Sequence, residues 1–323
     1  MQLVESRKEG LYCTVGDFYI DPILPVNKAW ITHAHADHYC SGCEAYFGHD
    51  QTIYFLKKRI GRIAPMTGIP YGVKRSINGV EISLHSAGHI PGSALIRLEY
   101  QGEVWLITGD LNPLGSVYCA PFAQLKCDHL ITECTFSHPK FVWPAQDLVF
   151  NQVQDWYETS INQQVVPILT AYSLGKAQKV QLMCKTLGIP YMVHQTVDKF
   201  NQCYRDLDFE IPDTSIVKDG IQPRDYEGQL IIAPPTVLKT AWLYRFNQVS
   251  TALCSGWVLE EGMVQKRGAN IGFCISDHAD FPDLVRHIKR SQADVVYLMH
   301  GDKARMASHL GDFHSNIKLL EYQ

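Results

Sequence analysis

The chain contains the run Thr32-His33-Ala34-His35-Ala36-Asp37-His38, which directly follows a short apolar stretch at residues 29–31. Alternate side chains of an extended strand share one face, so His33 and His35 can point at one metal ion. Asp37 and His38 lie past the expected strand end, where they can turn toward a second ion. Divalent cations such as zinc accept imidazole and carboxylate ligands. We interpret the run as half of a two-metal site rather than as a solvated His-rich turn.

Three further residues lie in loops or at strand ends, where active-site groups are commonly placed. His89 lies in a glycine-flanked loop between two expected strands. Asp110 and His300 follow apolar runs at residues 104–107 and 295–299. None of the three would indicate a site if it stood alone; aspartate, for example, is common in turns. Their coincidence with the first run favours a bridged pair of metal ions.

The size and composition are those of a globular protein. The 323 residues, of which 46% are hydrophobic, can build one large domain or two joined ones around a buried core. The first residues lack the apolar segment of a secretory signal, and no apolar run is long enough to span a bilayer. We therefore expect a cytoplasmic location and no membrane partner.

The net charge of −4 argues against a broad basic surface for nucleic acid. It does not exclude a nuclease, because two divalent cations would add up to four positive charges at the site. Small basic clusters occur at residues 57–62, 176–179 and 289–290. Each is more often a solvated helix face than a binding surface.

The 10 cysteines are scattered without the spacing of a disulfide scaffold, so reduced thiols are expected. The pair Cys40-x-x-Cys43 could bind a metal or be redox-active. No second pair accompanies it, and an ordinary structural role is preferred.

The chain alternates between two patterns of secondary structure. Up to about residue 140, short β-rich runs alternate with turns, which indicates a sheet-dominated region. The middle then shows a helical pattern at 144–157, a buried strand at 165–171 and a helix at 175–187, which favour a parallel sheet. Residues 271–275 return to the first pattern. The middle third is therefore interpreted as inserted into a fold that resumes after it.

These ligand elements, in this order, resemble the metallo-β-lactamase superfamily. Residues 131–136, with Glu133, resemble the acidic motif of its β-CASP nuclease branch, and residues 274–281, with His278, resemble the histidine motif. Residues 171–178 are similar to a helix start in the β-CASP insertion. The resemblance implies an α/β fold: a metallo-β-lactamase αββα sandwich with an inserted β-CASP α/β domain. The implied domains are residues 1–145 and 256–323 for the sandwich and 146–255 for the insert.

The subgroup that the chain resembles most is that of the bacterial ligase-associated DNA exonucleases. Residues 10–13, 17–22, 255–257 and 276–280 carry this likeness. It implies a DNA exonuclease in DNA repair that acts on DNA, single-stranded or with a free end, with an ATP-dependent DNA ligase and a helicase as partners. Histidine at the last motif, here His300, is commoner in RNA-cleaving members of the family. An RNA-processing nuclease, like ribonuclease J or the polyadenylation endonuclease, therefore stays open as the alternative.

The resemblance also implies a role for each site residue. The cofactors are two divalent metal ions, Zn²⁺ in the first place with Mn²⁺ as the alternative. One ion would be held by His33, His35 and His89 and the other by Asp37, His38 and His300, with Asp110 bridging them. A metal-bridging hydroxide would be the nucleophile that attacks phosphorus.

Seven further residues complete the expected catalytic and binding groups. His278 is the candidate general acid and Glu133 its partner, since a carboxylate that holds one ring nitrogen stabilises the protonated imidazole and fixes its direction. Asp21 is expected to support the metal ligands from behind. Candidate contacts to the substrate backbone and bases are Ser173, Lys176, Ser255 and Trp257.

Two other functions were weighed. A thioesterase or lactonase on the same metal core is disfavoured, because the 190 positions from Asp110 to His300 (300 − 110) leave room for a domain that could cradle a polymer. A catalytically inactive binding subunit is disfavoured, because such subunits typically lose ligands and every expected ligand is present here.

Overall fold

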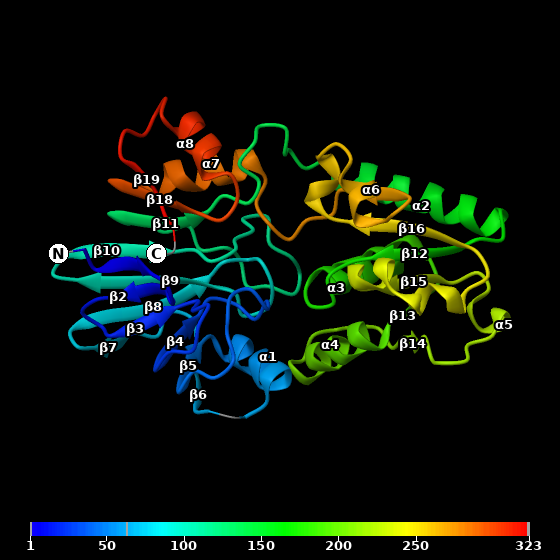
Figure 1. The fold of residues 1–323 in the computed structure, drawn as a ribbon, viewed down its shortest axis with the longest axis horizontal. Coiled ribbons are helices and arrows are strands. Elements are labelled where there is room, and N and C mark those ends of the chain that lie inside the picture. The colour runs from blue at the N-terminus through cyan, green and yellow to red at the C-terminus, as the bar shows by residue number, and fades with distance from the viewer. Residues whose placement is uncertain (1, 63, 322–323) are drawn as a thin grey trace. The chain divides into compact units, whose positions relative to one another are not determined.

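The computed structural model describes residues 2–62 and 64–321, and the chain divides into two compact units (Figure 1). Unit 1 comprises Met1–Phe141 and Asp277–Gln323, and unit 2 comprises Val142–Ser276. Unit 1 is thus built from two segments of the chain, and unit 2 is the segment between them. Among the described residues, no helix combines the length and the apolar character that crossing a membrane requires.

The first sheet of unit 1 has six strands in sequence order. Its first three strands pair antiparallel, and the following neighbours pair parallel. The strands are β1 (Val4–Arg7), β2 (Gly10–Cys13), β3 (Phe18–Ile20), β4 (Lys28–Ile31), β5 (Ala45–Gly48) and β6 (Met66–Gly68).

The second sheet of unit 1 has seven strands in the order β19-β18-β11-β10-β9-β8-β7. These are β7 (Arg75–Ile77), β8 (Val80–Ser86), β9 (Ala94–Tyr100), β10 (Glu103–Ile107), β11 (His129–Glu133), β18 (Val295–Met299) and β19 (Ile317–Leu319). β10, β11 and β18 are parallel neighbours, so their carboxyl ends lie at one edge of the sheet. A strand from the C-terminal segment of unit 1 therefore lies inside this sheet.

Unit 1 is layered as helix, sheet, sheet, helix. The two sheets enclose one core, in which Trp30 of the first sheet and Trp105 of the second are fully buried. α1 (Asp50–Ile60) packs against β5 and β6 of the first sheet. A separate cluster joins the other face of the second sheet to α7 (Phe281–Ser291) and α8 (Lys303–Leu310). Each sheet is thus covered on both faces.

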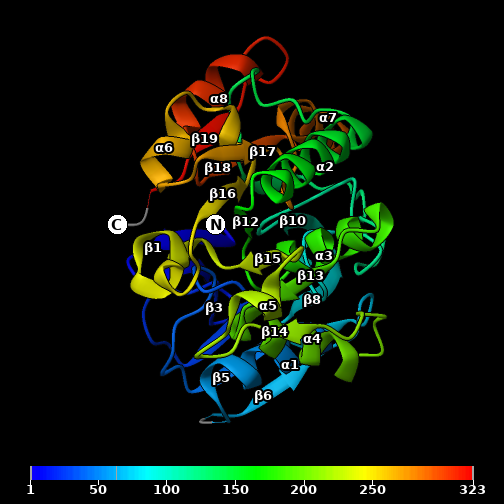
Figure 2. The same cartoon turned by 90° about the vertical axis from the view of Figure 1, so that its right-hand side faces the viewer.

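Unit 2 is built on a six-stranded parallel sheet in the order β14-β13-β15-β12-β16-β17. Its strands are β12 (Val166–Thr170), β13 (Tyr191–Val193), β14 (Ser215–Ile216), β15 (Leu230–Ala233), β16 (Val249–Cys254) and β17 (Ile271–Phe273). Its helices are α2 (Gln146–Asn162), α3 (Lys176–Leu187), α4 (Gln195–Asp206), α5 (Pro223–Tyr226) and α6 (Met263–Arg267), with 3-10 turns η1 (Pro235–Lys239), η2 (Ala241–Arg245) and η3 (Gly256–Leu259) (Figure 2).

The central strands β12 and β15 of unit 2 are buried on both faces, as parallel strands usually are. In β15, Leu230 and Ile232 join a cluster with α2, α3 and α4. Ile231 and Ala233 of the same strand face a second cluster that includes α5 and η1. The alternation along one strand therefore explains why its residues read as a continuous apolar run in the sequence.

The return to unit 1 comes later than expected. Residues 271–275 were assigned to the pattern of the first region, but β17 pairs with β16 and completes the sheet of unit 2. A side chain at Gly272 would come within 2.7 Å of Val258 and Val264, so η3 and α6 pack closely on this strand. Unit 2 thus extends to Ser276, and the chain re-enters unit 1 at Asp277 rather than at residue 256.

Candidate metal centre

The candidate ligands lie where strands of unit 1 end. His33 and its neighbours follow β4, Asp110 follows β10, and His300 follows β18. Glu133 is the last residue of β11. Because β10, β11 and β18 are parallel neighbours, these three ends bring their side chains to one edge of the sheet.

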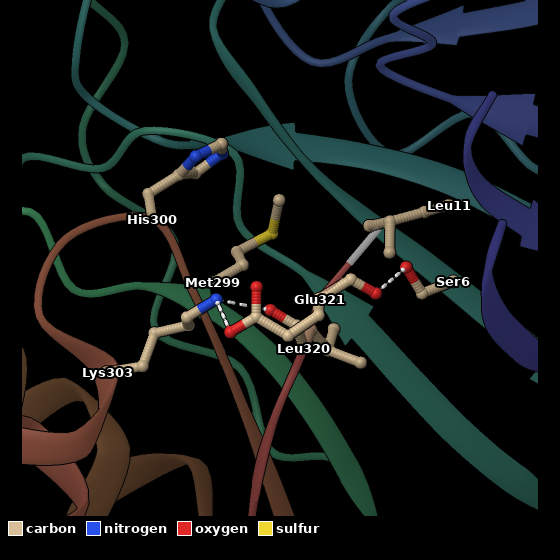
Figure 3. A pocket seen from close by; sticks show the side chains of 7 residues that line it. All are labelled: Ser6, Leu11, Met299, His300, Lys303, Leu320 and Glu321. Atoms are coloured by element: carbon tan, nitrogen blue, oxygen red, sulfur yellow. Dashed lines mark hydrogen bonds and ion pairs between the residues drawn. The ribbon is translucent and has the colours of Figure 1, made fainter. Parts of the chain in front are cut away.

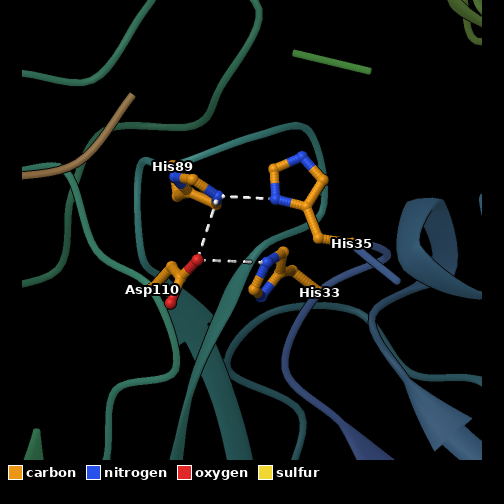
Figure 4. A group of neighbouring side chains, drawn as sticks. All are labelled: His33, His35, His89 and Asp110. Atoms are coloured by element: carbon orange, nitrogen blue, oxygen red, sulfur yellow. Dashed lines mark hydrogen bonds and ion pairs between the residues drawn. The ribbon is translucent and has the colours of Figure 1, made fainter. Parts of the chain in front are cut away.

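Asp110 lies at the centre of the site, with imidazoles around it (Figure 4). Its Oδ2 is 3.5 Å from His33 Nε2 and 3.5 Å from His89 Nε2. Its Oδ1 is 3.3 Å from His38 Nε2. His35 Nδ1 lies 3.0 Å from His89 Nε2. The structure therefore brings five of the predicted ligands together around one carboxylate.

The spacing of these atoms fits a divalent cation. One ligand atom from each of four residues, His33, His35, His89 and Asp110, lies within 4.8 Å of the others. In a tetrahedral zinc site with bonds of about 2.0 Å, neighbouring ligand atoms are about 3.3 Å apart, close to the 3.0 and 3.5 Å found here. His33 Nε2 is buried and has no hydrogen-bond partner. A bound cation would satisfy this nitrogen.

Two imidazoles are oriented by hydrogen bonds made on their outer side. His89 Nδ1 donates to the carbonyl of Asp277 at 2.8 Å, because a carbonyl can only accept. His38 Nδ1 donates to Asp21 Oδ2 at 2.7 Å. Both rings are thereby left with Nε2 facing Asp110. Such outer partners fix the ring direction of metal-binding histidines.

Asp21 bonds to the last imidazole of the histidine run and to Thr32 at the start of that run. Asp21 Oδ1 accepts the backbone N–H of Thr32 at 2.8 Å, and Oδ2 accepts the Thr32 hydroxyl at 2.5 Å. Asp21 has a φ of 44°, an uncommon backbone conformation for a residue other than glycine. Its carboxylate therefore holds both the start of the histidine run and its last imidazole.

The electrostatics of His33, His89 and Asp110 favour the protonation states that bind metal, whereas those of His38 favour the protonated ring. Burial, followed by the charges of neighbouring groups, holds the pKa of His33 and that of His89 well below the ordinary value. Burial favours the neutral form of Asp110, but the surrounding imidazoles, His38 first, outweigh it and hold its pKa well below the usual range. Burial also opposes a charged His38, yet Asp110 and Asp21 hold its pKa well above the ordinary value. Neutral imidazoles beside a charged carboxylate are suited to a cation.

Glu133 and His278 form a second group that shares Asp110. His278 Nδ1 lies 3.1 Å from both Glu133 oxygens, and its Nε2 points to Asp110 Oδ2 at 3.7 Å. The buried Glu133 also accepts the N–H of Leu111 at 2.8 Å and the hydroxyl of Thr135 at 2.5 Å. The carboxylate is therefore fixed, and it aims one ring nitrogen of His278 at the centre.

The chain is similar in sequence to several known proteins. No protein-family model matches the chain. It is 28% identical over 309 residues to a probable DNA ligase of Opitutus terrae, covering 93% of this chain and 29% of that protein. It is 25% identical over 194 residues to the DNA cross-link repair protein SNM1 of Arabidopsis thaliana, covering 57% of this chain and 40% of that protein. It is 29% identical over 130 residues to RNase aCSPSF2 of Saccharolobus solfataricus, covering 39% of this chain and 26% of that protein.

The chain is a relative of the β-CASP nucleases of the metallo-β-lactamase superfamily. The resemblance predicted from the motifs is thereby confirmed. The chain spans less than half the length of each of these relatives, 29%, 40% and 26%. Its several sheets and mixed α/β architecture agree with those of metallo-β-lactamase relatives.

His300, the residue of the last β-CASP motif, adopts a constrained backbone. Its φ is 59°, and Gly301 follows with a φ of 64°. A Cβ on Gly301 would lie only 2.1 Å from the carbonyl oxygen of Cys134. The Cys134 thiol donates to the carbonyl of His300 at 2.7 Å. The ring of His300 lies 5.6 Å from that of His38, so two of the three candidate ligands of the second ion are neighbours.

A cavity of about 200 Å³ adjoins His300 (Figure 3). Its lining is Ser6, Leu11, Met299, His300, Lys303, Leu320 and Glu321. Lys303 Nζ donates to the carbonyl of Leu320 at 2.7 Å and to Glu321 at 2.5 Å. The ammonium group of Lys303 in this cavity is therefore paired with groups of unit 1.

Asp37, like His300, is a predicted ligand that the structure does not bring into the cluster around Asp110. It is exposed, although it follows His35 on the same turn. Neither group of potential ligand residues found in the described part of the chain contains it. Its assignment to the second ion stays a prediction.

The four candidate substrate contacts lie in unit 2, after the carboxyl ends of β12 and β16, which are parallel neighbours. Lys176 is only 3% exposed, and its ammonium lies 4.9 Å from the centre of the Tyr172 ring. The Ser255 hydroxyl accepts the N–H of Trp257 and caps η3. Ser173 is half-buried, and its carbonyl accepts Gln178. These residues thus share one edge of the sheet of unit 2.

Sequence reasoning missed several groups that hold the site. They are the Thr32 hydroxyl, the Asp277 carbonyl, the Leu111 N–H and the Thr135 hydroxyl. Thr32 directly precedes His33, and Asp277 directly precedes His278. This position beside a motif residue is the one sign in the sequence that they belong to the site. A backbone carbonyl carries no side-chain signature at all.

Proposed function

We propose that this protein is a metal-dependent phosphodiesterase that degrades DNA from an end during DNA repair. The observation that carries the proposal is the ring of histidines around Asp110 beside the Glu133–His278 pair. The names of two relatives refer to a DNA ligase and to DNA cross-link repair. They support DNA as the substrate class.

In this proposal two ions, Zn²⁺ in the first place, bind at the centre. His33, His35 and His89 would hold one ion, and Asp37, His38 and His300 the other, with Asp110 between them. When bound, such ions supply Lewis acidity toward phosphate oxygens and make water a nucleophile near neutral pH. The outer hydrogen bonds of His38 and His89 keep the ligand nitrogens aimed at this place.

His278 supplies the proton that the leaving oxygen needs. Its Nδ1 is held by Glu133, so the proton to be transferred is the one on Nε2, which faces the centre. Glu133 acts through His278 and is a positioning residue. Its own oxygens are engaged by Leu111 and Thr135, which stops the carboxylate from turning away.

Unit 2 would be the inserted β-CASP domain of this nuclease. Its parallel sheet with helices on both faces is consistent with that assignment. Ser173, Lys176, Ser255 and Trp257 are proposed to contact the substrate from its carboxyl edge, where ligands bind in sheets of this type. The match to a probable DNA ligase favours a ligase as the functional partner. A helicase partner and a cytoplasmic location stay predictions.

We expect the purified protein to carry close to two zinc or manganese ions. The donor set is rich in imidazole, which suits zinc among the abundant cations. Elemental analysis of protein prepared without added metal gives the content, and chelator should remove both metal and activity. A metal-free preparation whose activity is indifferent to chelator would contradict the proposal.

The substrate is tested with end-labelled linear single-stranded DNA, a circle of the same sequence and the matching RNA. We expect stepwise release of nucleotides from the linear DNA and none from the circle. The reason is that Ser173 and Lys176 are proposed to bind the terminal phosphate, which a circle does not have. Binding should weaken with salt, but less steeply than for strongly basic proteins, given the net charge of −4. Rapid cutting of the circle would disprove the exonuclease assignment.

The second candidate function is RNA processing on the same site. His300 favours it, as does the likeness to RNase aCSPSF2. A preference for the RNA over the DNA of the same sequence would replace the first proposal by this one.

A further inference from the structure

Cys40 and Cys43 form a thiol pair for which the proposed function has no use. Their sulfur atoms lie 3.8 Å apart, in van der Waals contact, and the two residues are not joined by a disulfide. They lie on the loop that directly continues the histidine run, two and five positions after His38. Any change of geometry at this pair is therefore transmitted along a very short stretch of backbone to a proposed metal ligand.

The loop between the two thiols is already closed. The Tyr46 hydroxyl accepts the N–H of Cys43 at 3.0 Å and donates to the carbonyl of Cys40 at 2.8 Å. Gly42, with a φ of 95°, makes the reversal that brings the two side chains together. The chain thus holds both sulfurs face to face while the thiols are reduced.

The two ends of the pair differ in how firmly they are held. Cys43 is buried, the next residue bonds to Val26 through its backbone, and the fully buried Tyr46 belongs to β5. Cys40 is half-exposed and lies outside any helix or strand. When the sulfurs approach, Cys40 is the side that moves.

We propose that Cys40 and Cys43 form a reversible disulfide that weakens metal binding at the adjacent His38. A disulfide bond is about 2.05 Å long, so the sulfurs must approach by about 1.8 Å. Moving Cys40 displaces the backbone two residues before it, where His38 contacts Asp21 and Asp110 at 2.7 and 3.3 Å. The proposal rests on the proposed function in so far as His38 holds a metal ion.

The oxidant is a small-molecule disulfide such as glutathione disulfide. The Cys40 thiolate attacks one sulfur, and the first glutathione leaves as a thiol after taking up a proton. The Cys43 thiolate then attacks the mixed disulfide at Cys40, and the second glutathione leaves in the same way. Two protein thiols are thereby oxidised by two electrons while glutathione disulfide is reduced to two thiols.

The test equilibrates the zinc-loaded protein for a long time in anaerobic glutathione buffers of increasing oxidised fraction. Thiols are then alkylated and assigned by peptide mass, and zinc affinity is measured by competition with a chromogenic chelator after removal of glutathione. We expect Cys40 and Cys43 to escape alkylation together and zinc affinity to fall about tenfold to a hundredfold, as when a group that orients a ligand is lost. A phosphine reductant should restore both.

Variants separate this switch from other effects. Two single variants, Cys40→Ser and Cys43→Ala, cannot form the disulfide. Each should bind zinc as tightly as the reduced unaltered protein does, at every ratio of oxidised to reduced glutathione. Cys119→Ser removes another half-buried cysteine of unit 1 and should keep the wild-type response. A Cys40→Ser protein that binds less zinc even when reduced would show that the thiols themselves bind the metal, which overturns the switch.

Two further results would overturn it. One is full alkylation of both thiols at every ratio, and the other is a disulfide that leaves zinc affinity unchanged. Reduced protein that binds no zinc would instead refute the proposed function, and the mass measurement would still decide whether the disulfide forms.

Discussion

Replacing Asp110 with asparagine should abolish phosphodiester cleavage, with a loss of at least about a thousandfold. Asparagine keeps the size of the side chain but removes the negative charge between His33, His38 and His89. Two cations at the centre would then repel each other without the carboxylate that separates them. Metal content should fall along with activity.

The measurement is turnover on end-labelled DNA together with elemental analysis and circular dichroism. We expect an unchanged spectrum, because the site lies at strand ends and not in the main core between the sheets. Asp312→Asn, at an exposed position of unit 1, is the matched control and should behave as the unaltered protein does. Near-normal turnover by the Asp110 variant would remove Asp110 from the proposed centre.

Replacing His278 with alanine should slow DNA cleavage by about two to four orders of magnitude, the usual contribution of a general acid. Metal content should be preserved, because the first cluster of ligand atoms does not include this ring. Glu133→Gln should show a weaker form of the same defect, since it leaves the acid in place but loosens its orientation.

The leaving group distinguishes a catalytic from a structural His278. An aryl phosphodiester with an activated leaving group needs no proton, so the His278 variant should hydrolyse it almost as fast as the unaltered protein. His309→Ala removes another half-buried imidazole of unit 1 and should change neither reaction. Equal damage by the His278 variant on both substrates would make the residue structural.

Much of the fold could be predicted from the sequence because its strands are short apolar runs bounded by turns. β18 has the bounds expected from its apolar run, and the parallel sheet of unit 2 follows from its buried strand and amphipathic helix. The site residues could be predicted for a related reason. Histidines and carboxylates directly follow such apolar runs, and the carboxyl ends of neighbouring parallel strands meet at one edge of the sheet. Asp110 and His300 could thus be selected without knowledge of any contact.

The rest depends on tertiary packing that the local sequence does not encode. α4 was not predicted, although Val197, Phe200, Cys203 and Tyr204 give it an apolar face. The same face carries Asn201, whose side chain bonds to Gln178 and Gln181 of α3, and this contact has no signature in the local sequence. The start of the second segment of unit 1 was missed because β17 has the same apolar character whichever sheet it joins. Asp37 shows that a position in a motif does not by itself bury a side chain.

The split of unit 1 affects how the protein emerges from the ribosome. Synthesis is vectorial, so β11 is made long before β18, its neighbour in the finished sheet. Until the second segment of unit 1, which begins at Asp277, is translated, β11 is an open edge and His89 lacks the Asp277 carbonyl that orients its ring. The proposed metal centre can therefore be completed only after this second segment has been made.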